Sequence, residues 1–120
     1  MYRVIHFEIN ATKPERAVRF YKKVFGWKVN KWRGPIPYWL VMTGKKKPGI
    51  NGGIMRRMKK ETTINTIDVP SVDRFMKKIT QAKGRVIHPK MAIPGVGYFA
   101  YCKDTEGNTF GIMEDNPKAR

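Results

Sequence analysis

The sequence predicts an α+β domain in which a βαβββ unit occurs twice, with helices on one face of a curved mixed sheet. Two series of residues about 58 positions apart carry the same apolar and glycine pattern. They are Ala17, Val18, Tyr21, Val24, Gly26 and Val29, and Phe75, Met76, Ile79, Ala82, Gly84 and Ile87. Residues 51–55 match residues 109–113 at the same distance, whereas Ile36, Tyr38 and Trp39 match Val96, Tyr98 and Phe99 sixty positions later. We therefore expect a single domain over residues 1–120, with repeats at about 3–58 and 62–115.

In the first repeat, residues 4–10 are predicted to form a strand because apolar and polar residues alternate. One face of this strand carries Ile5, Phe7 and Ile9, and the other carries His6, Glu8 and Asn10. Thr12 is a candidate helix N-cap before Pro14, and the helix is predicted to continue to about Phe25, where Gly26 ends it. Strands are expected at about 27–32, 38–43 and 52–57, with a basic turn at 44–49.

The second repeat follows the same order. A strand at about 63–69 precedes a helix that is capped by Ser71 and ends near Lys83. Strands are expected at 85–88, 97–103 and 108–114, and His88, which precedes Pro89, is expected where the first of these strands passes into a loop. The residues after Asp115 are expected to fray.

Composition excludes several classes of protein. A chain of 120 residues with 41% hydrophobic residues has enough apolar material for a packed core, so disorder is not expected. No apolar run is long enough to span a bilayer and no signal peptide is evident, so we expect a cytoplasmic protein without a membrane partner. The single cysteine, Cys102, cannot form an internal disulfide and is expected to be a buried, inert thiol.

The chain is strongly basic, with 25 Lys and Arg against nine Asp and Glu, a net charge of +16. This charge favours anionic partners through long-range attraction. The basic residues form no single stripe, however, and no zinc-finger, RNP or KH motif is present. We therefore expect no specific nucleic-acid binding, and at most weak, non-specific association at low salt.

Three stretches resemble the vicinal oxygen chelate family of glyoxalases, bleomycin-resistance-type binding proteins and extradiol dioxygenases. They are residues 4–9, the F-Y-x-x-V-F-G-W motif at 20–27, and the D-x-x-G-N turn at 104–108. Residues 93–101 further resemble a glyoxalase-like subgroup, and the resemblance covers essentially the whole chain. It implies that each repeat curves its sheet into half of a cup, with the helices on the outer face. It also implies four metal-ligand positions inside the cup, one on the first and one on the fourth strand of each repeat.

The repeat allows these four positions to be compared within the chain. His6 matches the family pattern, whereas the aligned positions hold Ile64, Gly53 and Gly111, which carry no ligating side chain. A catalytic metal of this type needs about three protein ligands. We therefore expect no metal cofactor.

Other donors remain as alternatives. Glu8 shares a strand face with His6, and Asn65 or Thr66 becomes a ligand if the register is shifted by one residue. Glu114 is close to the last position but is expected on the opposite face from Gly111.

Without a metal, His6 and Glu8 are candidate catalytic residues, because a carboxylate two residues away on one strand face can orient an imidazole by a hydrogen bond. The alternative is that both residues simply line a wet cup. Gly53 and Gly111 favour either an open, roomy cup or close packing of the two half-sheets. The predicted ligand-binding residues are His6, Glu8, Trp39, Gly53, Met55, Thr66, Tyr98, Gly111 and Met113.

We therefore expect a glyoxalase-like homodimer that binds a small anionic or aromatic organic molecule without the usual metal. The alternative is a metal-dependent lyase, isomerase or dioxygenase of the same family that uses His6 and Glu8. A third alternative is an accessory protein that associates with nucleic acid through its basic surface.

Overall fold

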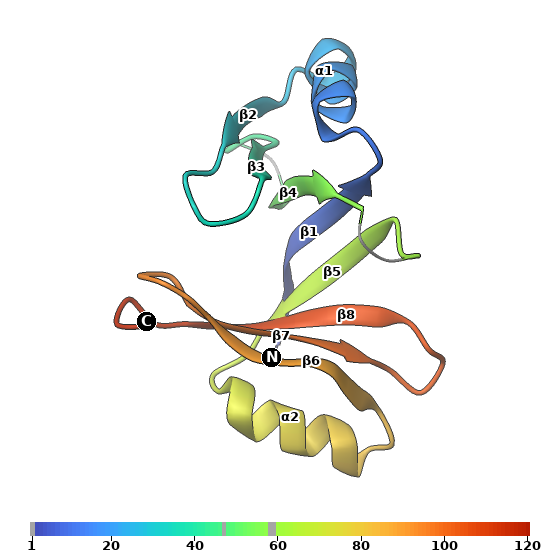
Figure 1. The fold of residues 1–120 in the computed structure, drawn as a ribbon, viewed down its shortest axis with the longest axis vertical. Coiled ribbons are helices and arrows are strands. Elements are labelled where there is room, and N and C mark those ends of the chain that lie inside the picture. Colours follow the sequence, from blue (N-terminus) through green and yellow to red (C-terminus); the bar gives the residue numbers. More distant parts are fainter. Residues whose placement is uncertain (1, 47, 58–59) are drawn as a thin grey trace. The chain divides into compact units, whose positions relative to one another are not determined.

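The computed structural model describes residues 2–46, 48–57 and 60–120, and it divides the chain into two compact units (Figure 1). The N-terminal unit is Ile5–Ile64, and the C-terminal unit is Asn65–Arg120 together with residues 2–4. Lys47, in the predicted basic turn, and Met58, at the predicted end of the first repeat, lie outside the described residues. No helix in the described part of the chain is long and apolar enough to cross a membrane.

The described residues of the N-terminal unit form one helix and four strands, the first of which begins at Val4, one residue before the boundary between the units. They are β1 (Val4–Ala11), α1 (Pro14–Phe25), β2 (Lys28–Lys31), β3 (Tyr38–Met42) and β4 (Asn51–Arg56). The strand order is β2-β3-β4-β1, in which β1 is parallel to β4 and the other neighbours are antiparallel. This sheet is therefore mixed, as predicted.

Aromatic rings attach α1 to its own sheet. Tyr21 of α1 stacks on Trp27 with ring centroids 4.7 Å apart and an interplanar angle of 4°, and Phe7 of β1 lies 5.7 Å from Trp27. The face of β1 that carries Phe7 is therefore the face covered by α1. Val41 and Ile54 are almost fully buried in this unit.

The ends of α1 follow local rules, with one correction. Gly26 ends the helix in the left-handed region (φ 69°), and its N–H donates to the Lys22 carbonyl at 3.0 Å, as predicted. The predicted Thr12 cap is wrong. Pro14 occupies the start of the helix, so the N-cap is Lys13, which makes no capping hydrogen bond with its side chain.

The C-terminal unit repeats the same order of elements. They are β5 (Thr63–Asp68), α2 (Val72–Gln81), β6 (Arg85–Ile93), β7 (Gly97–Lys103) and β8 (Thr109–Asp115). The strand order is β5-β8-β7-β6, with β5 parallel to β8. Its core contains Val69, Val72, Ala100, Cys102 and Ile112, against which Phe75, Met76 and Ile79 of α2 pack. Cys102 is a buried free thiol, as expected.

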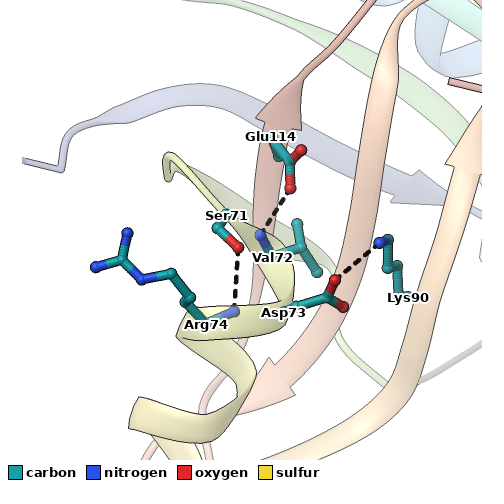
Figure 2. A network of polar contacts seen from close by, with 6 residues as sticks. All are labelled: Ser71, Val72, Asp73, Arg74, Lys90 and Glu114. Atoms are coloured by element: carbon teal, nitrogen blue, oxygen red, sulfur yellow. Dashed lines mark hydrogen bonds and ion pairs between the residues drawn. The ribbon is translucent and has the colours of Figure 1, made fainter. Parts of the chain in front are cut away.

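Polar groups fix the start of α2 (Figure 2). Ser71 is the predicted N-cap, and its Oγ accepts a hydrogen bond from the Arg74 N–H at 3.2 Å. Glu114 of β8 accepts a second bond, from the Val72 N–H at 2.9 Å. Glu114 is therefore on the α2 side of β8, opposite to Gly111, as the alternation predicts.

Two segments of the C-terminal unit differ from prediction. β6 continues to Ile93 through two irregularities in its pairing with β7, so the strand does not end in a loop at His88, as predicted, but runs five residues further. The tail does not fray: the Gly95 N–H donates to the Ala119 carbonyl at 3.0 Å, and the Asn116 N–H donates to the Val96 carbonyl at 2.9 Å. These two bonds hold the tail against the β6–β7 turn and bury Ala119.

The strand register gives the correspondence between the two units. Glu8 pairs with Gly53 in one unit and Thr66 pairs with Gly111 in the other, which confirms the spacing of 58 residues. The spacing of 60 predicted for the third strands is wrong by one residue. Leu40 faces Gly53 and Tyr101 faces Gly111, so Tyr38 corresponds to Phe99 rather than to Tyr98. The α+β class and the two βαβββ repeats are confirmed.

Candidate functional site

The candidate site lies on the face of the N-terminal sheet that α1 does not cover. Strand partners share a face, and His6 and Glu8 alternate with Phe7, which faces α1. Glu8 pairs with Gly53, and Met55 pairs with Tyr38. One face of this unit therefore brings together His6, Glu8, Tyr38, Gly53 and Met55.

The centre of the site is a contact between His6 and Tyr38. The Tyr38 hydroxyl lies 2.8 Å from His6 Nε2, and the two rings are nearly parallel, at 15°, with centroids 6.4 Å apart. A Cβ atom at position 53 would collide with the Tyr38 hydroxyl. Glycine at this position is therefore what allows Tyr38 to cross β4 and reach His6.

Burial sets the ionisation of this pair. Burial lowers the pKa of His6, which favours the neutral imidazole. Burial also raises the pKa of Tyr38, and the nearby charge of Glu8 raises it further. Glu8 itself is only 7% exposed. When the phenol donates its proton to Nε2, the neutral ring carries its own proton on Nδ1 and presents an N–H donor there.

The C-terminal unit holds an apolar version of the same arrangement. On β5, which begins two residues before the boundary between the units, Thr66 takes the place of Glu8 and the buried Ile64 takes the place of His6. The Phe99 ring lies over Gly111, where an added Cβ would collide with it. In both units an aromatic ring of the same unit therefore covers the glycine, so neither glycine leaves empty space above its own sheet.

The remaining residues predicted to bind ligand lie on different faces of their sheets, some on the glycine side and some on the helix side. Met113 pairs with Phe99, so it lies on the same face as Gly111 and Thr66. Trp39 pairs with Ile54 on the α1 side of its sheet, with Lys31 Nζ 5.3 Å from its ring centroid. Tyr98 packs against the α2 core, with Lys90 Nζ 4.3 Å from its ring centroid. The structure thus does not bring Trp39 and Tyr98 together with the other predicted site residues.

Sequence reasoning missed Tyr38 as the partner of His6, and named Glu8 instead. The structure gives His6 a hydrogen bond to Tyr38 from 32 residues away, which no local pattern predicts. A signal was nevertheless present, because both repeats combine a glycine on the fourth strand with an aromatic residue on the third.

The residues at the implied metal positions do not fit a metal. The strand register places Ile64 at the position in the second repeat that corresponds to His6 in the first. The shift of one residue that would make Asn65 or Thr66 a metal ligand is therefore not observed. The four positions hold one imidazole, whose Nε2 contacts Tyr38, together with one isoleucine and two glycines. Within the described ranges, no group of three or more His, Cys, Asp and Glu residues is close enough to hold a metal ion.

Comparisons with known proteins agree with the fold. The model of the Glyoxalase/Bleomycin resistance protein/Dioxygenase superfamily matches residues 3–112. A glyoxylase-like domain-containing protein from Didymella fabae is 30% identical over 112 residues, which are 88% of this chain and 88% of that protein.

Solved structures are similar in fold at low sequence identity. The methylmalonyl-CoA epimerase from Mycobacterium tuberculosis has a TM-score of 0.73 and is 12% identical, with 95% of this chain and 88% of that chain covered. The hypothetical protein BH1468 from Bacillus halodurans C-125 has a TM-score of 0.74 and is 12% identical, with 99% of this chain and 98% of that chain covered.

Proposed function

Because the chain belongs to the Glyoxalase/Bleomycin resistance protein/Dioxygenase superfamily, we propose that it binds a small anionic or aromatic organic molecule at the His6–Tyr38 pair, without a chelating metal. The observation that carries this proposal is the Tyr38 hydroxyl, which lies over Gly53 and contacts His6 Nε2 at 2.8 Å. A ring thus fills one position where the family resemblance implies a metal ligand.

The chemistry of the pair supports an oxygen-containing ligand. A neutral His6 with its proton on Nδ1 donates one hydrogen bond, and a carboxylate or phenolate oxygen is the strongest acceptor for it. The raised pKa of Tyr38 keeps the phenol protonated, so the pair itself carries no negative charge, and the negative charge nearest to it is that of the buried Glu8.

Apolar side chains beside the pair support an aromatic or aliphatic body on the ligand. Leu40 and Met42 alternate with Val41 on β3, so they share the face of Tyr38, and they are 42% and 37% exposed. Ligand sites commonly combine such apolar surface with a few polar groups that orient the ligand. The basic N-terminal unit adds a favourable field for an anion.

The test is titration of the protein with benzoate, phenol and methylmalonyl-CoA, followed by NMR shifts of the backbone amides of β1, β3 and β4. Methylmalonyl-CoA is included because proteins of similar fold are named as its epimerases. We expect benzoate to shift amides near His6, and His6→Gln or Tyr38→Phe to weaken the binding about tenfold, as expected for loss of one charge-assisted hydrogen bond.

Matched controls are His88→Gln and Tyr98→Phe, which change the same side chains outside the site. Equal weakening by a control and its site variant would contradict the proposal. So would binding that appears only after Zn²⁺ or Ni²⁺ is added, because that result would support a metal-dependent lyase, isomerase or dioxygenase that uses His6 and Glu8.

A further inference from the structure

The outward surface of α1 carries three large apolar side chains that its own unit leaves exposed. Phe20 is 54% exposed, Val24 56% and Phe25 59%. Phe20 and Phe25 contact each other edge to face, with centroids 6.4 Å apart, so the exposed surface is continuous. We call these three residues the α1 ridge.

The internal repeat shows that the fold does not require the α1 ridge to be apolar. Fifty-eight residues later, the corresponding positions of the second repeat hold Lys78, Ala82 and Lys83. Tyr21 in α1 and Ile79 in α2 attach each helix to its sheet. Phe25 also contacts the rings of Tyr21 and Trp27, but more than half of its side chain stays exposed. An exposed apolar patch that packing does not demand is typical of an interaction site.

Positively charged residues lie on the same helix as the α1 ridge. α1 carries Arg16, Arg19, Lys22 and Lys23, and none of the four forms an ion pair in the described part of the chain. Beside Phe20 lies a shallow groove of about 360 Å³ whose rim includes Lys13 and Arg16. The N-terminal unit has 15 Lys and Arg against three Asp and Glu, a net charge of +12, whereas the C-terminal unit has 10 against six, a net charge of +4.

We propose that the α1 ridge docks on an anionic phospholipid surface, with the three apolar side chains entering the headgroup region and the cations contacting lipid phosphates and carboxylates. A helix with aromatic residues on one side and Lys and Arg beside them is the usual form of such a peripheral membrane contact. The expectation of no membrane partner rested on the lack of a spanning segment, and a surface contact needs none.

The charge and the apolar side chains of α1 favour a phospholipid surface over two other partners, a second copy of the chain and nucleic acid. A second copy would place the cations of two α1 helices against each other, which is unfavourable. Nucleic acid would pair with the cations, but its phosphate backbone would leave Phe20 and Val24 exposed to water.

The test is co-sedimentation of the full chain with vesicles of phosphatidylserine and phosphatidylcholine, and with vesicles of phosphatidylcholine alone. We expect binding to the anionic vesicles that falls as salt increases, and little binding to the neutral ones. Phe20→Ser/Val24→Ser should weaken the binding at least about tenfold, because it removes apolar side chains that would enter the bilayer surface. Its control, Lys78→Ser/Ala82→Ser, changes the corresponding positions of the second repeat and should not weaken the apolar contact.

A pair of charge variants keeps the proposal testable if the serine variant misfolds. Arg19→Gln/Lys23→Gln and Lys77→Gln/Lys78→Gln each remove two positive charges, the first pair from α1 and the second from α2. The first should weaken binding at least about fivefold more than the second. Equal effects would overturn the proposal, since net charge alone would then explain the binding. Absence of binding to anionic vesicles would also overturn it, as would a dimer that dissociates when Phe20 and Val24 are replaced.

Discussion

At the scale of single residues, Tyr38 connects the fold to the proposed function. Its ring crosses the position where a longer side chain at residue 53 would otherwise project, and its hydroxyl contacts His6 Nε2. The backbone conformation at residue 53 does not require glycine, but the space that Tyr38 occupies does. The same relation between Phe99 and Gly111 lacks the hydroxyl and the histidine, so the His6–Tyr38 hydrogen bond has no counterpart at Gly111.

Replacing Tyr38 by Phe should lower the free energy of unfolding by about 1 kcal/mol, because one partly buried hydrogen bond is lost and His6 Nε2 loses its partner. Urea unfolding followed by circular dichroism measures this change. Tyr98→Phe is the control. A Tyr38→Phe variant as stable as the wild type, with an unchanged His6 titration by NMR, would contradict the contact.

The lowered pKa of His6 predicts how stability depends on pH. Between its lowered folded pKa and its ordinary value of 6.5, the unfolded chain binds a proton that the folded chain does not bind. The free energy of unfolding should therefore fall as the pH falls through this window. We expect the wild type to lose more stability than His6→Gln between about pH 7.5 and about pH 5, as measured by urea unfolding. Parallel curves for the two proteins would show that His6 does not titrate differently on folding.

At the scale of elements, the start of α2 shows how a strand fixes a helix. The Val72 N–H is one of the donors that a helix leaves without an internal partner, and Glu114 of β8 accepts its hydrogen bond (Figure 2). The carboxylate also lies at the positive end of the helix dipole. This contact joins α2 to the strand that carries Gly111.

Replacing Glu114 by Ala should lower the free energy of unfolding by about 1–3 kcal/mol, because it leaves the N–H of the buried Val72 without a partner. Thermal and urea unfolding measure the loss. Glu106→Ala, in the exposed turn before β8, removes the same charge and should have little effect. Similar losses for both variants would mean that net charge, rather than the cap, determines the result.

Element order was predictable from the sequence, whereas ends and long-range partners were less so. The periodic residues gave both helices and all the strands, and Gly26 and Ser71 set their ends through backbone geometry that these residue types favour. The cap at Thr12 failed because Pro14 fixes the helix start one residue later. The contact of Tyr38 with His6 joins β3 to β1 across β4, which no local pattern predicts. Alternation shows that one member of each adjacent aromatic pair faces the site, but it does not show which one, and the register of β3 and β7 identifies Tyr38 and Phe99 rather than Trp39 and Tyr98.

At the scale of the whole molecule, two similar units carry different surfaces. The repeat preserves the residues that attach each helix to its sheet, while charge, the polar site and the α1 ridge are concentrated in the N-terminal unit. The C-terminal unit instead has the capped α2 and the docked tail. Differences between repeats are therefore better guides to function here than the features that they share.

Deleting residues 116–120 should destabilise the C-terminal unit by about 1–2 kcal/mol, because two backbone hydrogen bonds to Gly95 and Val96 would be lost. Hydrogen exchange at the Gly95 amide should become faster in the deletion variant, and urea unfolding measures the global effect. Deletion of Arg120 alone is the control, since it keeps Ala119. Unchanged exchange at Gly95 would show that the tail does not hold the β6–β7 turn.

The most direct test of the central claim is native mass spectrometry of the purified protein with and without added Zn²⁺, Ni²⁺, Mn²⁺ or Fe²⁺. Recognition through His6 and Tyr38 predicts no stoichiometric metal, and binding of benzoate that needs no metal and is weakened in Tyr38→Phe. One metal ion per chain that is lost in both His6→Ala and Glu8→Ala would contradict the claim and establish metal-dependent chemistry at this site.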